Sequence, residues 1–237
     1  ESILAAVRRL LLPVDSPLAG RHVVVTAGGT REPIDAVRVI ANRSSGKQGH
    51  AIAAEAARRG AKVTLITTVP FVGERSSGLT EISVETAAEM KAAVDSAAAG
   101  ADVVVMTAAV ADFRPVPISQ GKWKKEDGAP SIVLEPTPDI LAGLGAAKRP
   151  GQVLVGFAAE TSNLIENARG KLARKNLDIV VANDVSAPQV GFGHDTNAVS
   201  IVTPDGVDTV DLTDKHRVAA HVLDSVEKSL HRKQERP

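Results

Sequence analysis

The sequence predicts an α/β fold with a doubly wound, mostly parallel sheet. Short apolar runs at 22–26, 62–67 and 102–107 alternate with alanine-rich stretches of helical character. Continuous apolar strands of this kind are typical of parallel sheets that helices cover on both faces. We therefore expect a Rossmann-like domain, which binds its ligands at the carboxyl ends of the strands.

Glycines mark the ends of the predicted helices. Helices over 46–59 and 86–99 would end at Gly60 and Gly100, because glycine readily adopts the conformation that closes a helix. The same alternation of strand and helix continues further along the chain. It predicts a strand at 152–157, a helix at about 161–175 and a strand at 178–181.

Two segments depart from this alternation. Residues 110–131 form a long polar stretch, and loops of this length inside a compact domain are usually lids or binding loops. The runs 199–202 and 207–210 flank an Asp-Gly turn, which predicts a β-hairpin extension. A last helix is expected over 214–230, and the tail 231–237 is expected to be frayed.

Composition excludes several classes of protein. The 237 residues carry 28 basic and 28 acidic side chains, and this balance argues against a general nucleic-acid or membrane binder. Aromatic residues make up 2%, which leaves no stacking platform for single-stranded nucleic acid. The chain has no cysteine, so it has no disulfide and no thiolate nucleophile, as fits a reducing cytoplasm. It also has no tyrosine to act as a catalytic acid.

The first residues differ from the rest of the chain. Apolar side chains at helical spacing predict an amphipathic helix or linker over 1–16, ahead of a single nucleotide-binding domain over 17–237. The chain starts at Glu1 rather than at methionine. The helix is expected to be either a piece of an upstream domain or a trimmed end.

Two stretches can hold an anion. Gly28 and Gly29 follow the first strand, where they either let a ligand approach the backbone or only form a tight turn. Ser44, Ser45 and Gly46 open the first helix, where hydroxyl groups, N–H groups and the helix dipole favour a phosphate. The plain alternative is a serine N-cap.

This stretch is not a Walker A loop. Such a loop needs glycine at position 41 and Ser or Thr at position 48, but the chain has Ala41 and Gln48 there. After the third strand, Asp112 can bind a ribose hydroxyl or a phosphate-bound cation, and Phe113 can flank a base. The alternative there is a surface ion pair between Asp112 and Arg114.

Lysines supply the remaining signals. Three of them surround Trp123 in the long polar stretch, and one that points inward could stabilise charge in a displacement. Lys171 and Lys175 share one helix face at i,i+4 spacing. In both places the alternative is a solvated charge. The six histidines show no metal-binding spacing.

Together these stretches resemble the phosphopantothenoylcysteine synthetase family of the bacterial CTP-dependent type. The resemblance extends in sequence order from about residue 21 to 201. It is carried by TAGGTREPID, VRVIANRSSGKQG, TAAVADFRP, KWKK, EPTPDIL, GFAAET, ARGKLARKNLDIVVANDVS and GFGHDTNAV.

The resemblance implies a reaction in two steps. The carboxylate of 4′-phosphopantothenate attacks the α-phosphorus of CTP and releases pyrophosphate, and the amine of L-cysteine then displaces CMP to form an amide. Mg²⁺ is expected, because both steps develop negative charge. The resemblance also implies a homodimer, with the hairpin as a candidate contact. In many bacteria an upstream flavin-dependent decarboxylase is fused to such a domain. Because this chain lacks the residues of that half, no flavin is expected in it.

The resemblance also assigns roles to residues. Asn42 and Lys122 are the implied catalytic residues, Lys122 being the lysine of the lid. Arg38, Asn42 and Ala109 are implied for the substrate, and Asp112 also for the metal. The implied nucleotide contacts are Ser44, Ser45, Gly46, Ala111, Asp112, Phe113, Lys122, Asp139, Phe157, Lys171 and Lys175.

Two other functions compete with this interpretation. A nicotinamide-dependent oxidoreductase fits the sheet pattern, but no G-x-G-x-x-G opens the first helix and the tyrosine of the short-chain class is missing. A regulatory nucleotide-binding module also fits, but it would need neither the lysine lid nor Asn42. Selectivity for CTP over ATP follows from the resemblance alone.

Overall fold

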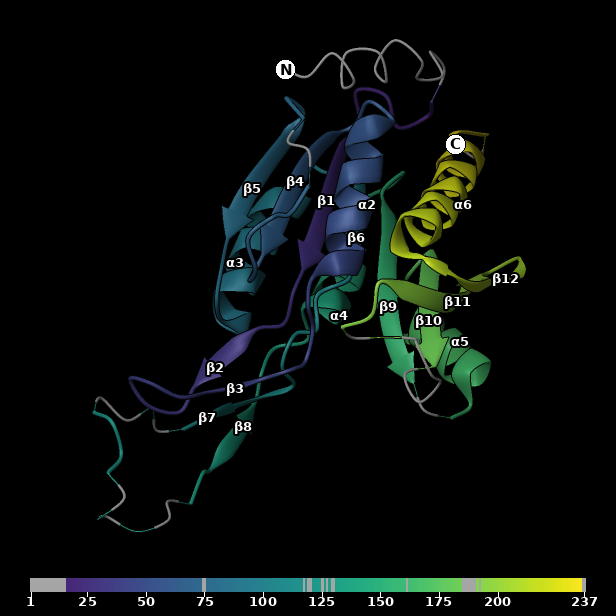
Figure 1. The fold of residues 1–237 in the computed structure, drawn as a ribbon. Coiled ribbons are helices and arrows are strands. Elements are labelled where there is room, and N and C mark those ends of the chain that lie inside the picture. Colours follow the sequence, from purple (N-terminus) through teal and green to yellow (C-terminus); the bar gives the residue numbers. More distant parts are fainter. Residues whose placement is uncertain are drawn as a thin grey trace.

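An eight-stranded sheet forms the centre of the molecule (Figure 1). The computed structural model describes residues 16–73, 76–116, 118, 121–124, 126, 128, 131–160, 162–184, 191 and 193–235. The strand order is β12-β11-β10-β9-β6-β1-β4-β5. The strands are β1 (His22–Ala27), β4 (Lys62–Thr67), β5 (Leu79–Ser83), β6 (Val103–Met106), β9 (Val153–Glu160), β10 (Ile179–Asp184), β11 (Thr196–Thr203) and β12 (Gly206–Asp214).

The sheet is mostly parallel, which confirms the predicted fold class. The strands from β10 through β5 run parallel to one another. β11 pairs antiparallel with both β10 and β12. The predicted hairpin therefore continues the central sheet, and its Asp-Gly turn joins β11 to β12.

Helices cover both faces of the sheet (Figure 1). One apolar core lies under α2 (Lys47–Arg58) and α6 (Lys215–Glu235). The other lies under α3 (Ala87–Ala98), α4 (Ile140–Ala146) and α5 (Leu164–Arg174). Successive side chains of a strand point to opposite faces, so the central strands, which helices cover on both faces, need apolar residues at most positions. This is why the strands read as continuous apolar runs.

The helix ends follow the local sequence. Gly60 has φ 84° just beyond α2, as predicted for a helix stop. At α3, Thr86 and Glu89 form a capping box. The expectation that the tail frays from residue 231 is wrong, because α6 continues to Glu235. Lys233 in the last turn lies 2.7 Å from an Asp178 carboxyl oxygen, and this contact fixes the helix end to the sheet.

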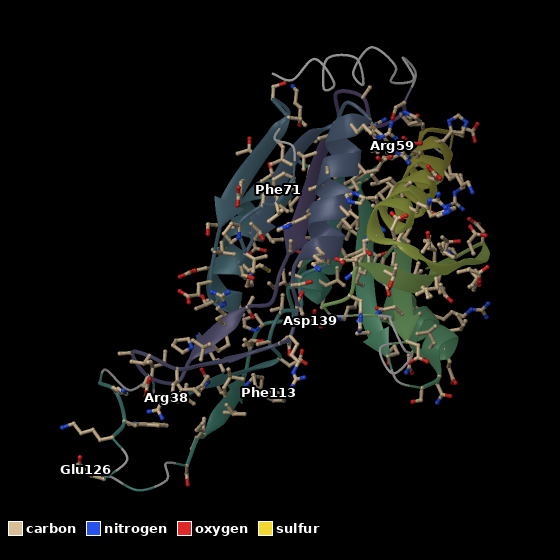
Figure 2. The ribbon with its side chains drawn as sticks, viewed as in Figure 1. Arg38, Arg59, Phe71, Phe113, Glu126 and Asp139 are labelled. Atoms are coloured by element: carbon tan, nitrogen blue, oxygen red, sulfur yellow. The ribbon has the colours of Figure 1, made fainter. Side chains whose placement is uncertain are left out.

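A buried arginine joins α2 to α6. Arg59 is 9% exposed and makes ion pairs with Glu55, Asp224 and Glu227 at 2.9, 2.8 and 3.2 Å. Its guanidinium also donates to the carbonyl of Ala220 at 3.0 Å. Figure 2 labels Arg59 where the two helices meet. The first and last described helices therefore share one polar network.

An arm projects from the carboxyl side of the sheet (Figure 1). Its described residues belong to 31–41, 113–116, 118, 121–124, 126, 128 and 131–136, with strands β2 (Arg31–Pro33), β3 (Val39–Ala41), β7 (Phe113–Pro115) and β8 (Leu134–Pro136). β2 pairs with β3, and β7 pairs with β8, both antiparallel. The segment predicted as one long loop over 110–131 thus contains a strand, β7, which pairs with β8 just beyond that segment.

Within the described part of the chain, no helix has both the length and the apolar content needed to cross a membrane. Of the predicted linker over 1–16, only Ser16 is among the described residues. Its hydroxyl donates to Glu227 of α6 at 2.8 Å.

Candidate functional site

A cavity of about 130 Å³ lies at the carboxyl end of the sheet. The ends of β1, β6, β9 and β10 and the start of α2 contribute to it, where ligands bind in folds of this class. It is lined by Gly28, Ser44, Ser45, Gly46, Lys47, Gln48, Gly49, Thr107, Ala108, Ala109, Phe157, Ala159, Asn183, Gly191, Asn197 and Lys215.

The N-terminus of α2 opens onto this cavity without a capping side chain. Its N-cap is Gly46 at φ 76°, and no described side chain caps the helix. The plain alternative, a serine N-cap, is therefore wrong. Ser44 and Ser45 line the cavity instead. Uncapped N–H groups and the helix dipole make this end of α2 suitable for an anion.

Gly49 brings α2 close to the sheet. A Cβ at this position would lie 2.6 Å from the Ala27 Cβ and 2.7 Å from both the Thr107 hydroxyl and the Thr26 carbonyl oxygen. Only glycine permits this approach, so the first turn of α2 lies directly over the ends of β1 and β6.

Asn42 lies beside the cavity, just after β3. Its side-chain amide donates to the carbonyls of Ala109 and Val110 at 3.2 and 3.4 Å. Ala109 lines the cavity, and its N–H donates to Gly28 at 2.8 Å. These bonds bring together two of the predicted substrate residues, Asn42 and Ala109.

The glycines after β1 lie in tightly packed positions. A Cβ on Gly28, which has φ 86°, would lie 2.1 Å from the Thr68 hydroxyl oxygen. A Cβ on Gly29 would lie 2.8 Å from the Asn42 carbonyl oxygen. The close packing fits the tight-turn alternative for both glycines, and because Gly28 also lines the cavity, ligand approach there stays a prediction.

A charged cluster adjoins the cavity at Phe157. The Lys171 ammonium donates to the Phe157 carbonyl at 3.2 Å, and Lys175 lies 2.6 Å from the Asp139 carboxyl. Burial, and then the charge of Lys175, lowers the pKa of Lys171. Asp112 is close enough to oppose this shift electrostatically. Lys171, Lys175, Asp139 and Asp112, four of the predicted nucleotide contacts, thus lie in one cluster. Phe157, a fifth predicted contact, accepts the hydrogen bond from Lys171.

Asp139 is fixed from two sides. Burial would raise its pKa, but hydrogen bonds from Lys175 and from the Ala142 N–H more than offset that, so its pKa is lowered. The second bond, at 3.0 Å, makes Asp139 the N-cap of α4. Figure 2 shows Asp139 near the carboxyl end of the sheet, at the base of the arm.

The remaining predicted residues lie elsewhere. Arg38, Phe113 and Lys122 belong to the arm and are not among the residues that line the cavity. Figure 2 labels Arg38 and Phe113 there. Phe113 is 53% exposed. Ala111 is buried and is not among the residues that line the cavity, and its N–H donates to the Thr30 hydroxyl at 2.9 Å.

Sequence reasoning missed Lys215, a buried cation in the cavity wall. It is 6% exposed, and its ammonium donates to the carbonyls of Gly191 and His194 at 3.2 and 2.5 Å. Burial, followed by the charge of Lys47, lowers its pKa. Lys47 itself pairs with Asp195 at 2.6 Å. Lys47 and Lys215 thus contact Gly191, Gly193, His194 and Asp195 beside the cavity.

No three acidic or histidine side chains gather as metal ligands among the described residues. Mg²⁺ does not need such a cluster in nucleotide sites, since one or two carboxylates and the substrate phosphates commonly hold it. The exposed carboxyl of Asp112, beside the lysine cluster, fits that arrangement.

The fold and the cavity define a doubly wound α/β domain with an uncapped helix N-terminus at its cavity, the class to which many nucleotide-binding proteins belong. Within that class, the chain belongs to the family described as DNA/pantothenate metabolism flavoprotein C-terminal domain, which matches residues 18–230.

Two relatives are close in sequence. The coenzyme A biosynthesis bifunctional protein CoaBC of Bacillus subtilis (strain 168) is 51% identical over 192 residues, which cover 81% of this chain and 47% of that protein. A cysteine/cysteine sulfinic acid decarboxylase of an unknown prokaryotic organism is 45% identical over 210 residues, which cover 88% of this chain and 58% of that protein. The chain thus spans about half the length of these curated relatives.

A solved structure agrees with the sheet and its helices. It is a crystal structure of the C-terminal domain of a coenzyme A biosynthesis bifunctional protein CoaBC. The TM-score is 0.76 at 39% sequence identity, and the match covers 92% of this chain and 99% of that one.

Proposed function

We propose that this chain joins 4′-phosphopantothenate to L-cysteine, with CTP as the activating nucleotide and an acyl-cytidylate as the intermediate. The observation that carries the proposal is that residues from several of the motifs that resemble the family line one cavity, in a chain 51% identical to a bifunctional protein of coenzyme A biosynthesis. The uncapped start of α2 and the two lysines of the wall supply positive potential, as a triphosphate requires.

The first half-reaction transfers a cytidylyl group. The substrate carboxylate attacks the α-phosphorus, the bond to the β-phosphate oxygen breaks, and pyrophosphate leaves. In this proposal Ser44, Ser45 and the N–H groups that follow Gly46 hold the triphosphate. Lys122 neutralises charge as the displacement proceeds. Asp112 would help to hold Mg²⁺, which would supply further charge neutralisation when bound.

The second half-reaction forms the amide. The cysteine amine attacks the acyl carbon, CMP leaves, and the amine loses a proton. We assign Asn42 to the acyl group, because its amide is held beside the cavity by the Ala109 and Val110 carbonyls. The cluster of Asp139, Lys171 and Lys175 is assigned to the nucleotide.

The proposed enzyme is a homodimer whose sites draw on both chains. Most of the large apolar side chains that the described residues expose lie on the arm, namely Val37, Val39, Phe113, Ile118, Ile132, Val133 and Leu134. Exposed apolar patches of this kind mark interaction surfaces. The arm is therefore a better candidate contact than the hairpin first considered. Arg38 and Lys122, which lie away from their own chain's cavity, would then serve the partner's site.

The oligomeric state tests this part of the proposal. Sedimentation velocity of the wild type should give a dimer, and Val133→Asp should shift it toward monomer because a charge would enter the apolar contact. A wild type that stays monomeric at assay concentrations would contradict the shared site.

An upstream domain and a location in the cell are also proposed. A flavin-dependent decarboxylase fused upstream is proposed from the bifunctional relatives, and the decarboxylase name of the second relative is not transferred to these residues. A cytoplasmic location is proposed because the reaction consumes CTP. The nicotinamide-dependent alternative loses its support, since the family match provides none for it.

Pyrophosphate release tests the function. The purified chain is supplied with Mg²⁺, 4′-phosphopantothenate and either CTP or ATP, with and without L-cysteine. We expect release that depends on CTP, and CMP and amide only when cysteine is present. Release with ATP alone would refute the nucleotide assignment, and no release with either nucleotide would refute the ligase.

A further inference from the structure

A buried carboxylate lies in the turn between β2 and β3. The side chain of Asp35 is 0% exposed. It accepts N–H bonds from the backbones of Val37 and Arg38, both at 2.8 Å, and from the Arg38 guanidinium, with Nε at 2.9 Å. A further bond comes from the Trp123 N–H at 3.2 Å. One carboxylate thus joins its own turn to a segment far away in the sequence.

Arg38 secures the same segment from the other side. Its guanidinium donates to the Trp123 carbonyl at 3.2 Å and lies 5.5 Å from the centre of the indole ring. Both backbone polar groups of Trp123 are therefore bound, and its ring is covered by a cation. The guanidinium, followed by the backbone N–H bonds, holds the pKa of Asp35 well below its usual range.

This arrangement fixes the residue next to Trp123. Lys122 is the proposed lysine of the first half-reaction, and its own side chain is exposed. A long exposed lysine is held in place poorly by its own contacts, so its position depends on the backbone that carries it. That backbone is anchored at Trp123, and the anchor is Asp35.

We propose that Asp35 is a positioning residue for nucleotidyl transfer: through Trp123 and Arg38, it holds Lys122 where charge develops on the nucleotide. This inference rests on the role given to Lys122 in the proposed function. Asp35 is assigned no contact with substrate.

The chain offers a direct reporter, because Trp123 is its only tryptophan. Its fluorescence measures how firmly the segment is held, whether or not the enzyme turns over. The main variant is Asp35→Asn, in which an amide N–H₂ would face the donors of Arg38 and Trp123. Asp35→Glu keeps the charge. Glu135→Gln is the control, since it removes another arm carboxylate, paired with Arg114 at 2.6 Å, that has no contact with Trp123 among those described.

Each variant is measured for acrylamide quenching and anisotropy of Trp123 and for pyrophosphate release with CTP. For Asp35→Asn we expect stronger quenching, lower anisotropy and a fall in kcat of roughly 10- to 100-fold, since a misplacement of about 1 Å can cost about 100-fold. The KM for CTP should change much less, because Lys122 acts as charge develops. Asp35→Glu should recover part of both signals, and Glu135→Gln should match the wild type.

A second variant guards against a general loss of folding. Trp123→Leu keeps the backbone N–H that Asp35 accepts, so kcat should fall less than in Asp35→Asn. Circular dichroism checks that both variants fold.

Two results would overturn the inference: unchanged Trp123 fluorescence in Asp35→Asn, or a released Trp123 with unchanged kcat. A wild type without CTP-dependent release would instead refute the proposed function, and with it the role of Lys122. The fluorescence would then still decide whether Asp35 anchors the segment.

Discussion

The close approach of α2 to the sheet predicts a loss of stability in Gly49→Ala. In an ordinary helix interior, this change would gain up to about 1 kcal/mol, because alanine favours helix over glycine. Here the new methyl would lie 2.7 Å from the Thr26 carbonyl oxygen, which is backbone, and 2.6 Å from the Ala27 Cβ. Overpacking of this kind costs about 1–3 kcal/mol, so the steric cost exceeds the gain.

The expected result is a net loss of up to about 2 kcal/mol in the free energy of unfolding, and a melting temperature lower by up to roughly 8 °C. The start of α2 should also move away from the cavity, so the KM for CTP should rise. Urea unfolding and the pyrophosphate assay measure the two effects.

Gly143→Ala provides a matched control. Gly143 lies in α4, and a Cβ there would meet nothing within 4 Å. This variant should therefore gain up to about 1 kcal/mol with unchanged activity. If Gly49→Ala also gained stability, the tight contact between α2 and the sheet would be refuted.

The other predictions concern single side chains. Asn42→Asp would turn a carboxylate toward two carbonyl oxygens, so pyrophosphate should still form while the acyl-cytidylate accumulates without amide, and full turnover would contradict the role of Asn42. Lys215→Met should lower the free energy of unfolding by about 1–3 kcal/mol and raise the KM for CTP, because two carbonyls lose their donor; an unchanged KM would exclude the wall from nucleotide binding. Thr86→Ala should cost about 1 kcal/mol in urea unfolding with unchanged activity, since it removes only the cap of α3. Burial lowers the pKa of His50 below 6.5, so unfolding takes up a proton there as the pH falls. The wild type should therefore lose more stability than His50→Gln between about pH 8 and about pH 5.5, and parallel losses would contradict the shift.

The central strands were predictable because each has a single strong signal. β4 has the predicted bounds, 62–67, and β1 extends the predicted 22–26 by one residue. Both are apolar on both faces, which only a covered sheet explains. β5 was missed because its sequence, LTEIS, is short and lies at the exposed edge of the sheet.

The arm could not be predicted for a different reason. Its strands have three residues each, too few for a periodic pattern, and they are stabilised by contacts between segments far apart in sequence. Asp35 illustrates this, since nothing near it in the sequence indicates that Trp123 will donate to it.

The cavity was predicted in part. The start of α2 and the end of β9 were found because glycine and small residues follow apolar runs. Lys215 gave no such signal, being one lysine at the start of a predicted helix. Its role depends on the carbonyls of Gly191 and His194, and backbone carbonyls carry no residue-specific signal in the sequence.

The network at Arg59 has a consequence for the order in which the molecule is made. The ribosome releases α2 and the first strands early, but the carboxylates of Asp224 and Glu227 that surround Arg59 lie on α6, the last helix described. Until α6 has been synthesised, the apolar side of α2 and the Arg59 guanidinium, both buried in the folded protein, remain exposed to solvent. The described part of the fold is therefore complete only after α6 has docked, and a nascent chain that stalled before residue 215 would be a substrate for chaperones rather than a smaller working domain.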